Sequence, residues 1–390
     1  MKKIILLLVV VLAAVLLSLA GCQQKENTAP TPPTGTYTNT PDWTATETYT
    51  ITPTKTGTPS ITPTHTFTAT ITLTHTDTST YTISPTSSVT PTFTVTPTIT
   101  ETNTPIHPYI MEWGGYGSSN GQFSDPYGLA LDGLGNIFVA DSFNNRIQKF
   151  DLSGTYITKW GSWGSANGQF DFCYDVSCDA SNNVYAVDYY NNRVQVFDNS
   201  GTYLRKWGSS GSGNGQFNSP SGICVDKVND VVYVADRGNS RIQMFDLVGV
   251  YLGEWGSSGS GNGQFNNPWE IVVDPVNSVC YVADSGNDRV QKFDLSGTYI
   301  TKWGSWGTGD GQFDEARYLT VDPTGTYVFV SDYRNNRVQK FDSNGNFLCK
   351  WGSSGSGPSQ FSWVRGIAVD SSGNVYVAES GNDRVQKFGP

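Results

Sequence analysis

Histidine is nearly absent from this chain, and its absence narrows the chemistry that the chain can perform. The 390 residues contain three histidines, His65, His75 and His107, and none lies beyond position 107. Zinc sites and most acid–base sites rely on histidine, and no serine lies in a strand-to-helix nucleophile elbow. We therefore expect residues 108–390 to contain no catalytic residue and no metal ligand.

A basic surface is missing as well. The chain has 24 Lys and Arg against 34 Asp and Glu, a net charge of −10. Without a basic stripe to neutralise phosphates, a nucleic-acid partner is not expected. Apart from Cys22, the cysteines are Cys173, Cys178, Cys224, Cys280 and Cys349. They form no repeated pattern, so we expect buried thiols, although Cys173 and Cys178 are close enough to form a disulfide in an oxidising compartment.

A long hydrophobic run occurs only at the start of the chain. Two lysines precede the apolar segment from Ile4 to Leu17, and Leu-Ala-Gly-Cys follows at 19–22. This order is typical of a signal peptide, and its end resembles a bacterial lipobox, which predicts lipid attachment to Cys22. An ordinary signal peptide or a short transmembrane anchor is the alternative. Residues 1–22 thus predict a lipoprotein of the cell envelope, at the outer membrane or cell surface in a Gram-negative cell, since Gln23 follows the cysteine.

Residues 23–107 consist mostly of Thr, Pro and Ser with isolated apolar residues. Proline interrupts every candidate strand, and no pairing partner is evident for the threonine alternation. We expect a disordered, low-complexity linker that acts as a spacer from the membrane. Its composition is similar to that of mucin-like stalks, and whether it is glycosylated stays open.

The remaining residues, 108–390, repeat with a period of 47 or 48. The dipeptide Gln-Phe marks the period, at 122–123, 169–170, 216–217, 264–265, 312–313 and 360–361. Each period contains four short β-branched and aromatic runs bounded by Gly, Asn, Asp or Ser, which read as four strands. Four-stranded antiparallel sheets arranged radially form an all-β propeller, here with six blades.

The third run of each period carries a more specific pattern. DSFNNRIQKF at 141–150, DYYNNRVQVF at 188–197 and DRGNSRIQMF at 236–245 resemble the NHL repeat. The resemblance covers all six units and implies the six-bladed NHL propeller fold. The second unit departs from it, with Cys173 and Asp175 in place of Pro and Gly.

The chain ends after a third strand, and YIMEWG at 109–114 is a fourth strand without a preceding blade. We therefore expect residues 109–113 to pair antiparallel with 384–388 and to complete the last blade. Such closure leaves no exposed sheet edge at the seam.

An acidic residue and an arginine recur five positions apart across the turn between strands two and three. We expect six structural ion pairs that staple the blades, each contributing about 0.2–1 kcal/mol if it is exposed. They are Asp141–Arg146, Asp188–Arg193, Asp236–Arg241, Asp284–Arg289, Asp332–Arg337 and Glu379–Arg384. The six tryptophans that end the fourth strands are expected to pack between blades.

A functional surface should break the repeat. The residues that enter strand one differ between blades, and so do those between strands two and three, on the same face. We expect these residues to ring the mouth of the central channel and bind a partner. The entry residues are Tyr127, Tyr174, Asp175, Trp269, Glu270, Arg317, Tyr318 and Arg365, and those of the other loop are Phe143, Tyr189, Tyr190, Arg237, Tyr333 and Arg334. Unselected loop variation is the alternative.

These features favour a membrane-tethered, monomeric binding or sensing module for a protein, peptide or glycan, on the face away from the linker. Related propellers include lyases and lactonases, so an enzyme with an all-oxygen Ca²⁺ site and a purely structural scaffold remain alternatives. Nothing in the sequence indicates Ca²⁺, and no cofactor is expected.

Overall fold

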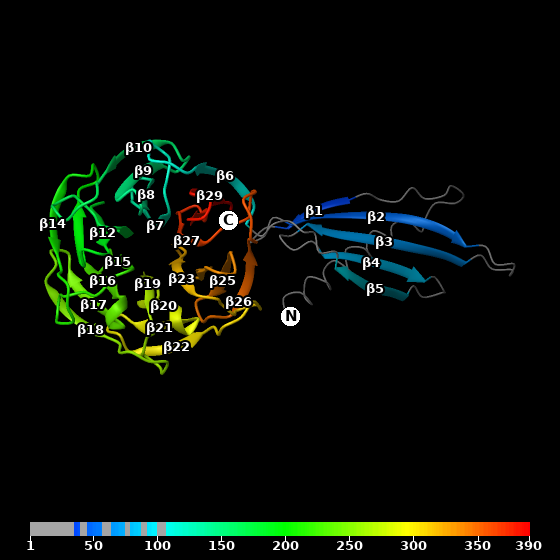
Figure 1. Cartoon of the computed structure of the whole chain (residues 1–390). Coiled ribbons are helices and arrows are strands. Elements are labelled where there is room, and N and C mark those ends of the chain that lie inside the picture. Colours follow the sequence, from blue (N-terminus) through cyan, green and yellow to red (C-terminus); the bar gives the residue numbers. More distant parts are fainter. Residues whose placement is uncertain (1–34, 40–44, 57–63, 75–78, 87–91, 100–106) are drawn as a thin grey trace. The chain divides into compact units, whose positions relative to one another are not determined.

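The computed structural model describes residues 35–39, 45–56, 64–74, 79–86, 92–99 and 107–390. The chain divides into two units, Met1–Thr104 and Pro105–Pro390 (Figure 1). In the described part, no helix is long and apolar enough to cross a membrane. Cys22 and the whole 1–22 segment lie outside the described residues, as do the stretches of the expected linker between its strands.

Described segments of the first unit form a five-stranded antiparallel sheet in sequence order. Its strands are β1 (Gly35–Asn39), β2 (Ala45–Thr56), β3 (Thr64–Thr74), β4 (Ser79–Thr86) and β5 (Thr92–Ile99). The expectation that the threonine alternation lacks pairing partners does not hold for these segments. Each alternating segment has the next one along the chain as its partner, and β-branched threonine suits an extended strand.

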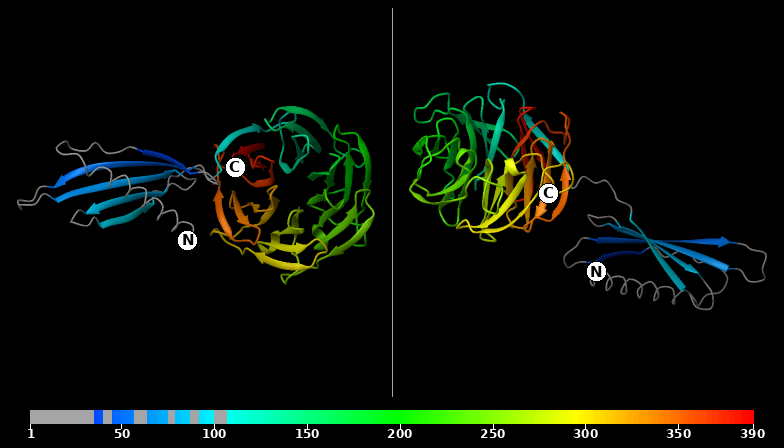
Figure 2. Two further views of the ribbon diagram at one scale, coloured as in Figure 1. Left: turned by 180° about the vertical axis from the view of Figure 1, so that it is seen from behind. Right: turned by 60° about the horizontal axis from the view of Figure 1, so that its bottom comes forward.

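The second unit is a six-bladed β-propeller of four-stranded antiparallel sheets (Figure 2), which confirms the predicted fold. The innermost strands are β7 (Pro126–Leu131), β11 (Cys173–Cys178), β15 (Ile223–Asp226), β19 (Pro268–Asp274), β23 (Ala316–Val321) and β27 (Val364–Val369). The second strands are β8 (Asn136–Asp141), β12 (Val184–Asp188), β16 (Val231–Asp236), β20 (Val279–Asp284), β24 (Tyr327–Asp332) and β28 (Val375–Glu379).

The third strands are β9 (Arg146–Asp151), β13 (Arg193–Phe197), β17 (Arg241–Asp246), β21 (Arg289–Asp294), β25 (Arg337–Asp342) and β29 (Arg384–Phe388). The outermost are β10 (Tyr156–Trp160), β14 (Tyr203–Trp207), β18 (Tyr251–Trp255), β22 (Tyr299–Trp303), β26 (Phe347–Trp351) and β6 (Tyr109–Gly114). We number the blades 1 to 6 from β7 to β27. Single 3₁₀ turns, η1 (Arg237–Asn239) and η2 (Ser285–Asn287), follow β16 and β20.

Burial explains why the strands differ in composition. The second strands are almost wholly buried, and VYAVD in β12 is buried at every position. The outermost strands instead alternate half-buried and exposed residues, as YITKW in β10 does. Strands covered on both faces have continuous apolar sequences, whereas a strand with one solvent-exposed face alternates apolar and polar residues.

The last blade is closed by both ends of the propeller, as predicted. β6 pairs antiparallel with β29, with Val385 opposite Trp113 and Phe388 opposite Tyr109. The backbone N–H of Gly389 also donates to the carbonyl of Pro108 at 2.8 Å. The seam therefore has the same ladder as the continuous blades.

The tryptophans of the outermost strands pack between blades. Trp113 of blade 6 lies 6.2 Å from the ring of Tyr376 in its own blade and 6.0 Å from Phe150 in blade 1. Gly154, in the hairpin before β10, lies against the same indole and has a φ of +76°. A Cβ there would come within 2.7 Å of the indole, so only glycine fits.

His107 takes the place of that hairpin glycine at the seam. It is 3% exposed, its ring lies 4.4 Å from Trp351, and its Nδ1 is 2.9 Å from the carbonyl oxygen of Gly389. The expectation of a propeller without histidine, with the linker ending at residue 107, is thus wrong at this position. In blade 6 the third and fourth strands come from opposite ends of the propeller, so no hairpin joins them. The imidazole of His107 covers Trp351 where a hairpin glycine covers the equivalent tryptophan in the other blades. Burial lowers the pKa of His107.

Candidate functional site: the strand-entry face and the axial cavity

Two sets of loops build one face of the propeller, here called the strand-entry face. The loops that lead into the innermost strands contact the turns between the second and third strands. In blade 1 the N–H of Phe143 donates to the carbonyl of Ser124 at 3.1 Å, and Asn144 donates to the carbonyl of Gly117 at 2.9 Å. The same contacts recur around the ring.

All six Asp/Glu–Arg pairs are formed, and they clamp these loops. In blade 1 the Arg146 Nε lies 2.6 Å from an Asp141 oxygen, and the guanidinium also donates to three loop carbonyls. The Asp141 side chain is fully buried, so the contribution given for exposed pairs does not apply. Removing one partner would leave a buried charge unpaired, which costs about 3–5 kcal/mol.

Most of the residues predicted to ring the channel mouth do converge there, but they are buried. Trp269 is 4% exposed, Arg365 4%, Tyr318 2% and Asp175 3%. The loops of six blades meet at one axis, and their side chains close the mouth instead of lining an open one. Only Phe143 and Tyr190, at 59% and 60%, and the Arg334 side chain, at 58%, are well exposed.

Eight of the converging side chains form a closed circuit that passes through every blade, here called the guanidinium–aromatic ring. Its members in order are Tyr127, Arg365, Tyr333, Arg317, Trp269, Arg237, Tyr189 and Tyr174. Each is in contact with the next, and the last closes on the first. No single blade reveals this arrangement, because each contributes only one or two members.

The guanidinium half of the ring consists of cations stacked on aromatic faces. Arg317 lies 4.0 Å from the ring centroid of Trp269 and 3.4 Å from that of Tyr333. Arg365 lies 4.4 Å from Tyr333 and 3.9 Å from Tyr127. Arg237 lies 4.5 Å from Trp269. Each distance is within the range of a cation–π contact.

Tyrosines complete the other half. Arg237 Nη1 donates to the Tyr189 hydroxyl at 3.2 Å. Tyr189 stacks on Tyr174 with centroids 4.6 Å apart, and Tyr174 lies 4.7 Å from Tyr127. Burial raises the pKa of Tyr127 to about 12, so its hydroxyl stays protonated at neutral pH.

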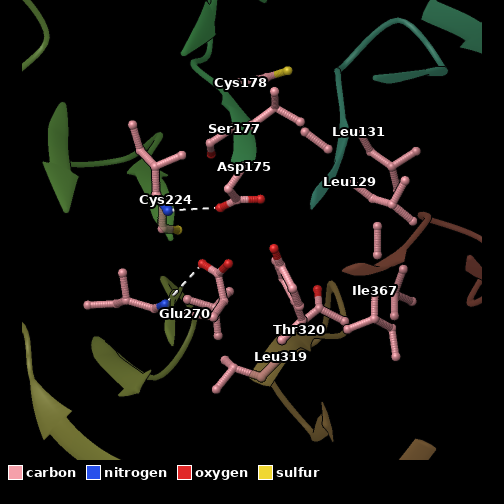
Figure 3. Close-up of a pocket in the computed structure, with 18 of the residues that line it drawn as sticks. Leu129, Leu131, Asp175, Ser177, Cys178, Cys224, Glu270, Leu319, Thr320 and Ile367 are labelled. Atoms are coloured by element: carbon pink, nitrogen blue, oxygen red, sulfur yellow. Dashed lines mark hydrogen bonds between the residues drawn. The ribbon is translucent and has the colours of Figure 1, made fainter. Parts of the chain in front are cut away.

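Beneath the ring lies a cavity of about 240 Å³ on the propeller axis (Figure 3). All six innermost strands line it, mostly with aliphatic side chains such as Leu129, Leu319 and Ile367. Lys227, at the end away from the ring, reaches across from blade 3 and donates to the carbonyl of Leu131 at 3.5 Å. The sequence predicted a central channel but not its lining, since alternate apolar residues of inner strands look like ordinary core.

Two carboxyl groups, Asp175 and Glu270, face each other in this cavity (Figure 3). Asp175 accepts the N–H of Ile223 at 2.8 Å, and Glu270 accepts that of Ile271 at 2.9 Å. Burial raises the pKa of Asp175 to about 7 and, together with the charge of Asp175, raises that of Glu270. The two carboxyl groups interact electrostatically, so they titrate as a pair rather than independently.

Gly222 and Gly128 leave room for these carboxyl groups on neighbouring strands. A Cβ at Gly128 would lie 1.9 Å from an Asp175 oxygen, and one at Gly222 would lie 2.9 Å from a Glu270 oxygen. Within the described residues, no three His, Cys, Asp or Glu side chains gather as the ligands of a metal would. A single pair of carboxyl groups does not fit the six to eight oxygen ligands of Ca²⁺.

Sequence reasoning also missed the outer part of the face. The loops into the innermost strands carry exposed aromatic residues in four blades. These are Tyr116 at 78%, Trp163 at 72%, Trp306 at 72% and Trp363 at 54%. A signal was present, because the positions equivalent to Trp163 hold serine in three of the six blades.

Comparison with known proteins supports the fold. A family model for the NHL repeat matches residues 123–150 and 361–388, and one for a 6-bladed beta-propeller matches 177–255. The B-box type zinc finger protein ncl-1 of Caenorhabditis elegans is 48% identical over 46 residues, 12% of this chain and 5% of that protein. The chain thus spans only a small part of that relative.

Solved structures share the architecture at low identity. A protein of unknown function from Bacteroides thetaiotaomicron is 15% identical, with a TM-score of 0.58 over 93% of this chain and 100% of that one. A streptogramin B lyase is 13% identical, with a TM-score of 0.53 over 73% and 98%. A gluconolactonase from Xanthomonas campestris is 12% identical, with a TM-score of 0.52 over 69% and 87%. The chain contains NHL repeats and folds as a six-bladed β-propeller.

Proposed function

We propose that this propeller is a binding module that takes a protein, peptide or glycan partner on its strand-entry face. One observation carries the proposal: of seven exposed aromatic side chains in the described part, six lie on this face. They are Tyr116, Phe143, Trp163, Tyr190, Trp306 and Trp363. The seventh, Tyr327, lies at the opposite face and is 36% exposed.

Exposed aromatic side chains are costly to leave in water and are enriched where proteins bind partners. Blades 1 and 2 hold a continuous group, since Phe172 lies 4.9 Å from Phe143 and 5.8 Å from Tyr190. The opposite face exposes aliphatic residues instead, such as Leu134, Val228 and Val276. This asymmetry favours selection for contact over random loop variation.

We also propose that the chain is anchored to a bacterial membrane through a lipid on Cys22. The support is the sequence of residues 1–22 alone. β6 begins at the end of the blade opposite the strand-entry face, because β29 runs from its clamp residue Arg384 toward Phe388 beside Tyr109. A chain anchored through its N-terminal side would then leave the aromatic face open to a partner.

The test is partner capture by the intact protein. Two variants are compared, each with three exposed apolar side chains replaced by Ala. Replacing Trp163, Tyr190 and Trp306 by Ala should abolish retention of partners from envelope extracts without lowering the melting temperature. The control variant replaces Leu134, Val228 and Val276 by Ala on the opposite face. Partners that bind both variants as they bind the unaltered chain would refute the proposal.

A second candidate function rests on the Asp175–Glu270 pair. A carboxyl pair with raised pKa values inside a cavity is an arrangement that enzymes use for proton transfer. We propose proton-transfer catalysis in the axial cavity as this alternative. Turnover of a lactone or cyclic ester by the unaltered chain, lost in Glu270→Gln, would favour it over the binding module.

A further inference from the structure

The guanidinium–aromatic ring contains more positive charge than its surroundings compensate. Among the described residues, only Arg317 of its three arginines has an ion pair, with Glu315, which also pairs with Arg334. Arg365 is 4% exposed and bonds only to the Ser380 and Tyr333 hydroxyls, at 3.0 Å and 3.5 Å. Buried charges are ordinarily paired with a counter-ion, so the Arg365 guanidinium is unusual. Arg237, which is half-buried, has no ion pair within the described residues either.

Several donors in the ring also have no acceptor. Within the described part, Arg365 Nη1, Arg237 Nε and Trp269 Nε1 are buried without a hydrogen-bond partner. A buried donor left unbonded destabilises the fold, and more so when it is charged. The half-buried Asp125 carboxyl interacts with the charge of Arg365, but among the described residues it is not within ion-pair distance of that guanidinium. The ring is therefore an incomplete polar network that an oxyanion would complete.

The distribution of arginine points the same way. The chain is acidic overall and has eleven arginines, six of them in the blade clamps. Of the other five, Arg237, Arg317, Arg334 and Arg365 lie on the strand-entry face. The same loops also carry acidic residues, among them Asp125, Asp314 and Glu315, so the attraction for an anion comes from the guanidiniums of the ring and not from the charge of the whole face.

We propose that the guanidinium–aromatic ring is a subsite for a carboxylate group that an acidic peptide partner presents. This inference rests on the binding function proposed for the same face and specifies its partner. The faces of the guanidiniums are covered by aromatic rings, so their N–H edges are what remain for bonding. A planar carboxylate matches such edges.

The packing of the ring favours a peptide over an acidic sugar. Trp269 already lies between Arg237 and Arg317, and Tyr333 contacts both Arg317 and Arg365. A pyranose therefore finds no open aromatic face to stack on within the ring. A glutamate carboxylate sits at the end of a slender two-methylene stem, so of the two ligands it needs the smaller displacement of the side chains that close the mouth.

Calorimetric titration of the full chain with a capped tetraglutamate peptide tests this directly. Capped tetraglutamine, glucuronate and inorganic phosphate serve as comparison ligands. We expect tetraglutamate to bind and the other three to bind at least tenfold more weakly, with an affinity that falls as salt rises. Equal binding of tetraglutamine, tighter binding of glucuronate or phosphate, or no binding of tetraglutamate would overturn the proposal.

Variants separate recognition from scaffolding. Arg365→Met should weaken tetraglutamate at least tenfold, with a melting temperature that is unchanged or raised, because a buried unpaired charge is removed. Arg205→Met is the matched control, since Arg205 stacks on Tyr185 with a carbonyl partner on Leu247, and it should bind normally. A destabilised Arg365→Met with unchanged peptide affinity would make the ring scaffold only. The binding function itself would not be refuted by that outcome, because it is tested separately by the Trp163, Tyr190 and Trp306 variant.

Discussion

The closing strand β6 offers the sharpest test of how the propeller is held together. Deleting residues 109–114 from the full chain would leave β29 as an unpaired edge. The deletion also removes Trp113, packed between Phe150 and Tyr376, and a tryptophan truncated in a core costs about 3–5 kcal/mol. The Glu112–Arg384 ion pair at 2.8 Å is half in solvent and adds about 0.2–1 kcal/mol.

We therefore expect the free energy of unfolding to fall by about 5 kcal/mol, a large part of the 5–15 kcal/mol typical of a folded domain. Urea unfolding followed by tryptophan fluorescence would measure it. The matched control moves the strand instead of losing it: YIMEWG is appended after Phe388 through the DLSGT hairpin found at 294–298.

The moved strand completes blade 6 as the other blades are completed, so stability should return to within about 1 kcal/mol. The hairpin appended alone should restore nothing. Unchanged stability after the deletion, or no recovery with the moved strand, would refute the closure argument.

Three further predictions follow from single residues. Mass spectrometry of the mature protein should find a diacyl or triacyl group on Cys22, and a Cys22→Ala chain that stays on the membrane would contradict this. Because burial raises the pKa of Asp175 to about 7, the folded protein holds its proton more tightly than the unfolded chain does. The free energy of unfolding should therefore fall as pH rises from about 4 toward 7, and Asp175→Asn should flatten that fall in urea titrations. Burial lowers the pKa of His107, so its contribution to stability is present above about pH 6.5 and lost as pH falls through the folded value. Melting curves of His107→Phe should lose less on acidification, and an equal loss would show that His107 is not responsible.

The repeat made most of the propeller predictable from sequence. A period repeated six times overdetermines four strands per blade, and the unmatched fourth strand at 109–114 predicts the seam. His107 could not be assigned in this way, because its role depends on Trp351 and Gly389, which are distant in sequence and adjacent only after closure.

Only part of the candidate site could be predicted from the sequence. Breaks in the repeat identified Trp269, Arg317 and Arg365 as a converging group. Their burial was not predictable, because it depends on how closely six loops approach one axis, which no single blade encodes. The position of Trp163 holds an aromatic residue in three blades and serine in the other three, and that break in the repeat could have revealed the outer aromatic residues.

The seam also decides how the propeller bears mechanical load. The start of β6 lies beside the end of β29, with Tyr109 opposite Phe388, and the hydrogen bonds of an antiparallel pair run perpendicular to the strands. Pulling residue 109 away from Pro390 would break this ladder one rung at a time, like a zipper. A force applied between residue 109 and the strand-entry face instead acts along β6, so it loads all the hydrogen bonds of the β6–β29 ladder together in shear. A chain held at its N-terminal side, with a partner drawn against the far face, is loaded along the stronger of these two directions.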